Sequence, residues 1–284
     1  MIDILFCGNI GVQDGLAMGV ISIAKHTKQP LNIIVLTMDL TSKNKKYKPM
    51  DTTFVAKLED YIKAVNSESK LTLVYVDELF ETYFKNSVNM KNLYSPYAFI
   101  RLLADKVEQV PDKVLYLDTD VVACKDISEL YNIDMQDYEY AGARDYFGKF
   151  FIDSDYINSG VLLLNMKRIR ETGLFEKCRD VVNNKKMGFP DQTALNKFVI
   201  KKMFIDDKYN SQRKDREKDV IRHFCKSIRF FPVFRTLNVK PYQHTKMHKA
   251  LKCYKFDDIY SELVKLKETI NEEQKDTNIL CNRW

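Results

Sequence analysis

Short apolar runs alternate along the chain with stretches whose apolar residues recur at helical spacing. Strands that alternate with helices in this way predict βαβ units, and therefore an α/β protein with a mostly parallel sheet. The last predicted helix is amphipathic, with Ile259, Leu263, Leu266 and Ile270 on one face. The other predicted strands and helices cover residues 1–7, 14–24, 31–38, 54–65, 71–76, 114–123 and 160–164, with Phe54, Leu58, Ile62 and Val65 on one helix face.

The run VLYLDTDVVA at residues 114–123 is unusual because two aspartates interrupt it. In an extended strand, Asp118 and Asp120 project to the same side and Thr119 to the other. Two converging carboxylates repel each other unless a cation lies between them, and their hard oxygen atoms suit Mg²⁺ or Mn²⁺. The alternative is structural, with one aspartate capping a helix and the other solvated.

Three later features add polar groups to this picture. Asp191 and Gln192 follow Pro190 and open a predicted helix, and His223 lies in VIRHFC. A lone histidine is more often a structural residue than a ligand. In residues 197–255 basic residues strongly outnumber acidic ones and are mixed with aromatics, which we interpret as a separate element.

Composition narrows the class of protein. With 284 residues and 45% hydrophobic content, the chain can bury one large core and a small appendage. A net charge of +6 is modest for this length, so nucleic-acid binding is not expected. The six cysteines are scattered, which argues against a zinc knuckle or a disulfide framework. The start MIDILFCGN lacks the basic residues of a signal peptide, so we expect a cytoplasmic protein.

Four ordered blocks, YAFIRLLAD, VLYLDTDVVACKDISELY, YINSGVLLLNMKRI and DQTALN, resemble the signature blocks of glycosyltransferase family 8. The opening LFCGNIGVQDGLAMGVISI is similar to the first strand and helix of that family, so the resemblance spans residues 1–232. It implies a GT-A type, Rossmann-like nucleotide-sugar-binding fold with a mixed, mostly parallel sheet. It also implies a UDP-sugar donor, Mn²⁺ (or Mg²⁺) as cofactor, and retention of the anomeric configuration.

The resemblance carries site roles to individual positions. Asp118, Asp120 and His223 match the metal ligands. Gln192 matches the residue nearest the reacting sugar carbon, Asp191 matches a position that lines the donor sugar, and both are expected to be catalytic. Gln192 would stabilise an oxocarbenium-like transition state in a front-face displacement. The other positions implied to bind the donor are Cys7, Gly8, Asn9, Val12, Arg101, Thr119, Asp145, Asn158, Ser159, Lys226 and Arg229.

Two positions depart from the family pattern. The family usually has an aromatic residue where this chain has Val12, which offers only an apolar contact to a base. After its histidine the family typically reads H-x-x-G-x-x-K-P-W, whereas this chain reads HFCKSIRFF. In that register Lys226 replaces the glycine, Arg229 replaces the lysine, and Phe230-Phe231 replaces Pro-Trp.

We therefore expect a catalytic domain at residues 1–232 and a basic, helical appendage at 233–284. The expected reaction is transfer of glucose or galactose from UDP-glucose or UDP-galactose to a glycan or lipid-linked acceptor, as in cell-surface polysaccharide synthesis. The appendage fits either peripheral contact with an anionic membrane or an ordinary solvated face. A catalytically silent nucleotide-sugar-binding protein and a nucleotidyltransferase are the alternatives, although GNIGVQDG lacks the basic residues of a triphosphate loop.

Overall fold

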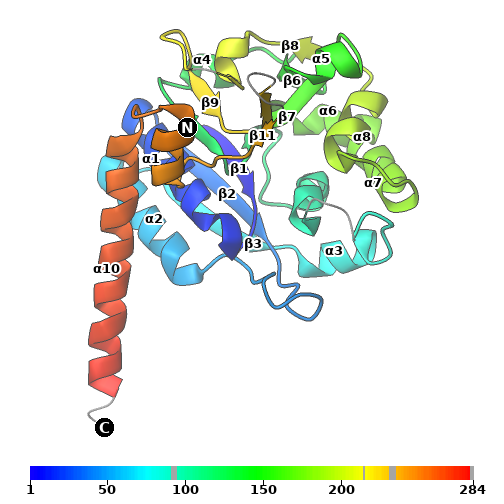
Figure 1. The fold of residues 1–284 in the computed structure, drawn as a ribbon. Coiled ribbons are helices and arrows are strands. Elements are labelled where there is room, and N and C mark those ends of the chain that lie inside the picture. The colour runs from blue at the N-terminus through cyan, green and yellow to red at the C-terminus, as the bar shows by residue number, and fades with distance from the viewer. Residues whose placement is uncertain (91–94, 214, 230–234, 282–284) are drawn as a thin grey trace.

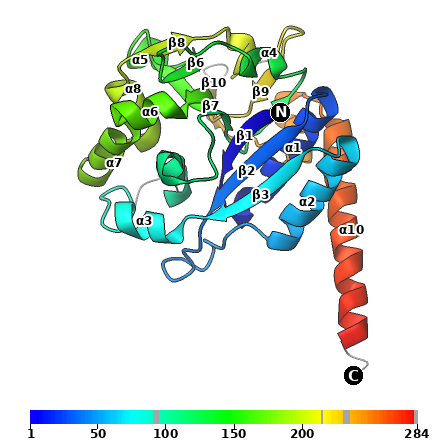
Figure 2. The same cartoon turned by 180° about the vertical axis from the view of Figure 1, so that it is seen from behind.

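The structure is a computed structural model that describes residues 1–90, 95–213, 215–229 and 235–281, without the side chains of 228, 229, 235 and 276–281. Within these residues the main sheet has seven strands in the order β3-β2-β1-β4-β7-β6-β8 (Figures 1 and 2). Strand β4 pairs in parallel with β1 but antiparallel with β7. The strands of this sheet are β1 (Ile2–Cys7), β2 (Leu31–Thr37), β3 (Lys70–Tyr75), β4 (Lys113–Leu117), β6 (Tyr140–Arg144), β7 (Ile157–Asn165) and β8 (Lys202–Phe204).

Helices cover both faces of this sheet, so the predicted α/β class with a mixed, mostly parallel sheet is confirmed. In β1, Ile4 and Phe6 enter one buried apolar cluster while Leu5 and Cys7 enter the other, as the two-residue period of a strand requires. The helices and helical turns are η1 (Ile10–Val12), α1 (Gln13–His26), α2 (Thr52–Val65), α3 (Asp77–Phe84), η2 (Pro96–Lys106), α4 (Ser128–Tyr131), α5 (Gly148–Phe151), α6 (Met166–Thr172), α7 (Leu174–Asn184), α8 (Pro190–Phe198), η3 (Asp207–Tyr209), α9 (His244–Lys246), η4 (Met247–Leu251) and α10 (Asp257–Cys281).

The apolar face predicted for the helix at residues 54–65 is buried except at its last residue. Phe54, Leu58 and Ile62 of α2 are buried, but Val65 is 52% exposed. Val65 is the last residue of the helix. A helical pattern predicts which side a residue faces but not whether the partner surface continues beneath it.

The run at 114–123 is not one strand. Strand β4 ends at Leu117, residues 118–120 form a turn, and the chain resumes as β5 (Val121–Ala123). Strand β5 leaves the main sheet and pairs with β9 (Ile221–His223). Thus Asp118 and Asp120 project from a turn between two sheets. The prediction that they lie on the same side of one strand was wrong, although the turn still brings them together.

Residues 197–255 do not form the separate element that we expected. Strand β8 pairs with β6 in the main sheet, and β9 pairs with β5. The strands β10 (Ser227–Arg229) and β11 (Arg235–Leu237) form a hairpin. The expected domain boundary at 232/233 lies outside the described residues.

Helix α10 packs its first half against α1 and α2, and its far end runs past the body of the protein (Figure 1). Its residues Ile259, Leu263, Leu266 and Ile270 are buried in the same apolar cluster as α1, as predicted. No helix among the described residues combines the length and the apolar character needed to cross a membrane.

Replacing Leu263 by alanine is expected to lower the free energy of unfolding by about 2–5 kcal/mol, because Leu263 is 2% exposed and its loss leaves a cavity under α10. Val65→Ala is the matched control, with an expected change below about 0.5 kcal/mol at an exposed site. Urea denaturation followed by circular dichroism measures both. Equal effects for the two variants would mean that α10 does not belong to the core.

Candidate active site

The turn of residues 118–120 lies close to the amino-terminal end of α1 because Gly15 makes room for it, while Gly8 makes room for Val12 beside it. A Cβ atom at Gly15 would lie 2.1 Å from the carbonyl oxygen of Thr119. A Cβ atom at Gly8, directly after β1, would lie 2.6 Å from the side chain of Val12 and 3.6 Å from that of Thr119. Any larger residue at Gly15 would push α1 away from the turn.

The turn brings Asp118 and Asp120 to His223, the last residue of β9. One ligand atom from each of the three side chains lies within 4.8 Å of the others. The Nε2 atom of His223 is 3.1 Å from Oδ1 of Asp120 and 3.8 Å from Oδ2 of Asp118. Residues that are more than 100 positions apart in the sequence therefore converge as the family resemblance implied.

A chain of amide hydrogen bonds orients the His223 ring. The Nδ1 atom of His223 lies 3.0 Å from Oδ1 of Asn210, and Nδ2 of Asn210 donates to Oδ1 of Asn158. Because Oδ1 of Asn210 can only accept, Nδ1 of His223 carries a proton, and in the neutral ring the lone pair of Nε2 is then left for a cation held with the two carboxylates. Gly160 lies beneath the ring, and a Cβ atom there would be 2.2 Å from its Cε1 atom.

Asp120 has one oxygen engaged and one free. Its Oδ2 accepts from the ammonium of Lys240, whereas its buried Oδ1 lacks a hydrogen-bond partner among the described residues. Burial raises the pKa of this carboxyl, but Lys240 and a protonated His223 ring outweigh burial and lower it, so Asp120 is ionised at neutral pH. An orphaned carboxylate oxygen, a second carboxylate and an imidazole lone pair together fit a divalent cation.

Asp118 is held by a buried guanidinium. Arg101 donates to its Oδ1 at 2.7 Å and to the carbonyl oxygen of Ser159 at 2.8 Å, and it forms a 3.2 Å ion pair with Asp191. The hydroxyl of Tyr116 also donates to Asp118 at 2.7 Å. Burial raises the pKa of Asp191, with Arg101 opposing the shift. In this structure the hydrogen bonds of Arg101 therefore hold Asp118 and the backbone of β7 in position.

The expected sugar-binding residues form one connected group beside the metal ligands. Oε1 of Gln192 accepts from the backbone N–H of Ser159 at 3.0 Å and from its hydroxyl at 3.2 Å. Asn158 donates to Oδ2 of Asp145 at 2.8 Å, and Nε2 of Gln192 approaches the same oxygen at 3.4 Å. The start of α8, the start of β7 and the end of β6 thus supply these groups.

The remaining residues that we expected to bind the donor differ in how far they are buried. Cys7 is buried, and burial raises the pKa of its thiol, so it is not a nucleophile at neutral pH. Asn9 precedes the helical turn η1, Val12 is its last residue, and both are partly buried. Lys226 is exposed, and the side chain of Arg229 lies outside the described residues, so their donor roles stay predictions.

Sequence reasoning missed three residues at the site: Tyr116, Asn210 and Lys240. Nothing in the sequence distinguishes Asn210, but Lys240 carried a signal. It precedes Pro241 and Tyr242, which repeat the Lys-Pro-aromatic order of the family pattern. The β10–β11 hairpin lies between this segment and His223. The alignment that matched Arg229 to the family lysine made no allowance for these additional residues.

Comparisons with known proteins identify the family of this chain. The model of the family described as glycosyl transferase family 8 matches residues 4–230. A Haemophilus influenzae protein assigned as a glycosyltransferase is 25% identical over 81% of this chain and 72% of its own length. The lipopolysaccharide 1,2-glucosyltransferase of Escherichia coli is 22% identical over 91% of this chain and 84% of its own. Glycosyltransferase GlyA of Streptococcus pneumoniae is 37% identical, but only over 39% of this chain and 16% of its own.

Solved structures show the same fold. The galactosyltransferase LgtC, in complex with donor and acceptor sugar analogues, superposes with a TM-score of 0.61 at 17% identity, over 92% of this chain and 95% of that one. Glycosyltransferase GlyE of Streptococcus pneumoniae superposes with a TM-score of 0.62 at 19% identity, over 92% of this chain and 63% of that one. The expected GT-A fold is confirmed. On the strength of the family match over most of its length, the chain belongs to glycosyl transferase family 8.

Proposed function

We propose that this protein transfers a hexose, glucose or galactose, from a UDP-sugar to a glycan or lipid-linked acceptor, with Mn²⁺ (or Mg²⁺) and with retention of configuration. The observation that carries this proposal is the convergence of Asp118, Asp120 and the oriented Nε2 of His223. Relatives that act on lipopolysaccharide support a hexose donor and a glycan acceptor. When bound, the cation takes up the charge that grows on the departing diphosphate.

The residues around the cation site have distinct roles in this proposal. Asp118 and Asp120 hold the cation, and Arg101 and Tyr116 keep Asp118 in place. Lys240 forms a partly buried ion pair with Asp120, and its ammonium would add a second positive charge beside a bound diphosphate. Although burial opposes it, Asp120 raises the pKa of Lys240, so the ammonium stays charged at neutral pH.

The sugar side of the site rests on Gln192 and its neighbours. Asp145, Asn158 and Ser159 present short polar groups that suit sugar hydroxyls, and Asp191 lies behind them against Arg101. Ser159 holds the amide of Gln192 by a hydrogen bond. Beside the reacting carbon, where the family resemblance puts this residue, an amide dipole would stabilise positive charge on the sugar. An amide is a poor nucleophile, which favours a front-face displacement over a covalent intermediate.

Gln192→Ala is expected to lower kcat by about 10²-fold with a smaller effect on KM, because the lost interaction strengthens only in the transition state. Lys197→Ala, at an exposed position of the same helix, is the control and should be neutral. Steady-state kinetics with saturating acceptor measure both variants. Near-normal kcat in Gln192→Ala would remove this residue from the chemistry.

An exposed basic surface near the carboxyl-terminal helix bears on the nature of the acceptor. Between Lys240 and α10, the lysines at 246, 249, 252 and 255 and the aromatic ring of Tyr254 are exposed. A basic surface with an exposed aromatic ring suits an anionic membrane or a lipid-linked acceptor. This supports a protein that works on the cytoplasmic side of a membrane.

The test of the proposed function is donor hydrolysis by the purified protein. UDP-glucose, UDP-galactose and the matched GDP-sugars are incubated with Mn²⁺ or with a chelator, and nucleotide release is followed. We expect Mn²⁺-dependent release of UDP from one of the UDP-hexoses and none from the GDP-sugars. Binding without release, even with trial acceptors present, would favour a silent binding protein, and the absence of binding would contradict the proposal.

A further inference from the structure

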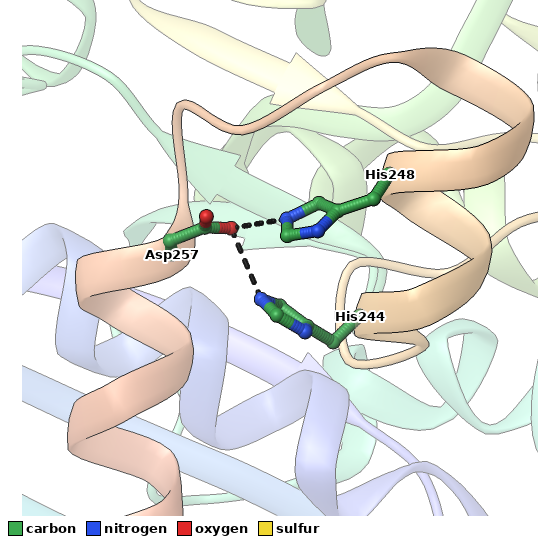
Figure 3. A group of neighbouring side chains, drawn as sticks. All are labelled: His244, His248 and Asp257. Atoms are coloured by element: carbon green, nitrogen blue, oxygen red, sulfur yellow. Dashed lines mark hydrogen bonds and ion pairs between the residues drawn. The ribbon is translucent and has the colours of Figure 1, made fainter.

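A second cluster of metal-ligating side chains lies in the carboxyl-terminal segment, away from the candidate active site. His244 lies on α9, His248 on the helical turn η4, and Asp257 is the first residue of α10 (Figure 3). The Nε2 atoms of His244 and His248 are 3.1 and 2.6 Å from the same oxygen, Oδ1 of Asp257. One ligand atom from each of the three residues lies within 4.8 Å of the others.

The two imidazole rings are held in place by aromatic neighbours. The ring of His244 stacks on Tyr260 at 4.4 Å with an interplanar angle of 15°, and that of His248 lies 4.4 Å from Tyr254. A spacing of four residues places both histidines on one side of a helical turn. Both rings turn the same nitrogen, Nε2, toward the carboxylate (Figure 3), so three ligand atoms from two segments are already positioned.

The chemistry of the three side chains also fits a cation. The ring centroids of His244 and His248 are 4.1 Å apart, so one ion can reach both rings. A divalent ion between the three side chains would bind two imidazole nitrogen atoms and one carboxylate oxygen.

We propose that His244, His248 and Asp257 form a second metal site, selective for a borderline transition-metal ion such as Zn²⁺ or Co²⁺. Two imidazoles and one carboxylate are a tetrahedral zinc set with the fourth position open to water. The side chains are 24–42% exposed, so an ion can enter from solvent. The cation site at Asp118 differs in having two carboxylates and one imidazole, a harder set that suits Mn²⁺.

A metal at this site would fasten the segment that carries Lys240. The ligands come from both ends of the chain between α9 and α10, and His244 is four residues beyond Lys240. Bound metal would therefore oppose local opening of residues 244–257. The turn that brings Lys240 to Asp120 would be stabilised with it.

The experiment titrates Co²⁺ into the full chain carrying Asp118→Asn and Asp120→Asn, which removes the candidate active-site ion. We expect about one equivalent of Co²⁺ with the visible absorption of a tetrahedral site, displaced by Zn²⁺. Adding His244→Gln and His248→Gln should weaken binding by at least about tenfold. His26→Gln is the matched control, a histidine outside both clusters, and should leave binding unchanged.

Thermal unfolding supplies a second readout that does not depend on activity. Zn²⁺ should raise the Tm of the protein with His244 and His248 intact and not that of the His244→Gln/His248→Gln protein. If that double variant does not fold, Asp257→Asn takes its place in both measurements. Absence of tetrahedral Co²⁺ absorption, or equal binding by the ligand variants and the control, would overturn the proposal and leave a hydrogen-bonded cluster.

Discussion

Replacing Asp120 by asparagine is expected to lower kcat by about 10²–10³-fold, the usual cost of removing one preorganised charge from a transition-state site. The amide keeps the shape of the side chain but removes the negative charge that pairs with Lys240 and faces His223. Its oxygen would also be a weaker ligand for a hard divalent cation. Steady-state donor hydrolysis at several Mn²⁺ concentrations measures the effect, which excess metal should only partly relieve.

The matched control for this variant is Asp180→Asn, at an exposed aspartate of α7. It changes the net charge by the same amount, so a loss that reflects charge alone would appear in both proteins. Circular dichroism confirms that Asp120→Asn is folded. Wild-type kcat in a folded Asp120→Asn protein would contradict a catalytic role for this carboxylate.

Gly160→Ala is expected to displace His223 and to lower both metal affinity and stability. The new Cβ atom would lie 2.2 Å from Cε1 and 2.8 Å from both ring nitrogens of His223, in a buried part of β7. Overpacking of this kind costs about 1–3 kcal/mol in unfolding free energy. Because the ring must move, Mn²⁺ affinity should fall by at least about tenfold. Calorimetry of Mn²⁺ binding and urea denaturation measure the two effects.

Gly19→Ala is the control for this substitution. Gly19 lies within α1, and its Cβ atom would meet neighbours at 3.4–3.5 Å, which is ordinary contact, so the protein should be unchanged or up to about 1 kcal/mol more stable. In a His223→Ala background the stability cost of Gly160→Ala should shrink, because the clashing ring is gone. An undiminished cost there would show that the glycine serves the β7 backbone rather than His223.

The sequence predicted the fold well because apolar periodicity reports burial directly. The strand pattern of residues 1–7 and the helical pattern through Ile259 and Ile270 correspond to β1 and α10. The pattern failed where pairing partners decide the outcome. Nothing in VLYLDTDVVA indicates that β5 leaves the sheet of β4, because both halves are equally apolar.

The candidate site was predictable only where a motif marked it. Asp118, Asp120 and His223 could be named from the family pattern, and they converge in the structure. Asn210 could not, because it acts through a hydrogen bond to His223 that only the fold creates. Lys240 was obscured because the β10–β11 hairpin shifts it along the chain from the position that the pattern assigns.

The central claim is that Asp118, Asp120 and His223 hold a divalent cation to which the donor diphosphate binds. Electron paramagnetic resonance of free Mn²⁺ during a titration with protein tests it most directly, with and without UDP, on protein carrying His244→Gln and His248→Gln so that only this site contributes. The account predicts one bound Mn²⁺, held more tightly when UDP is present, and its loss in Asp120→Asn. An affinity for Mn²⁺ that is changed neither by UDP nor by the Asp120→Asn substitution would contradict it.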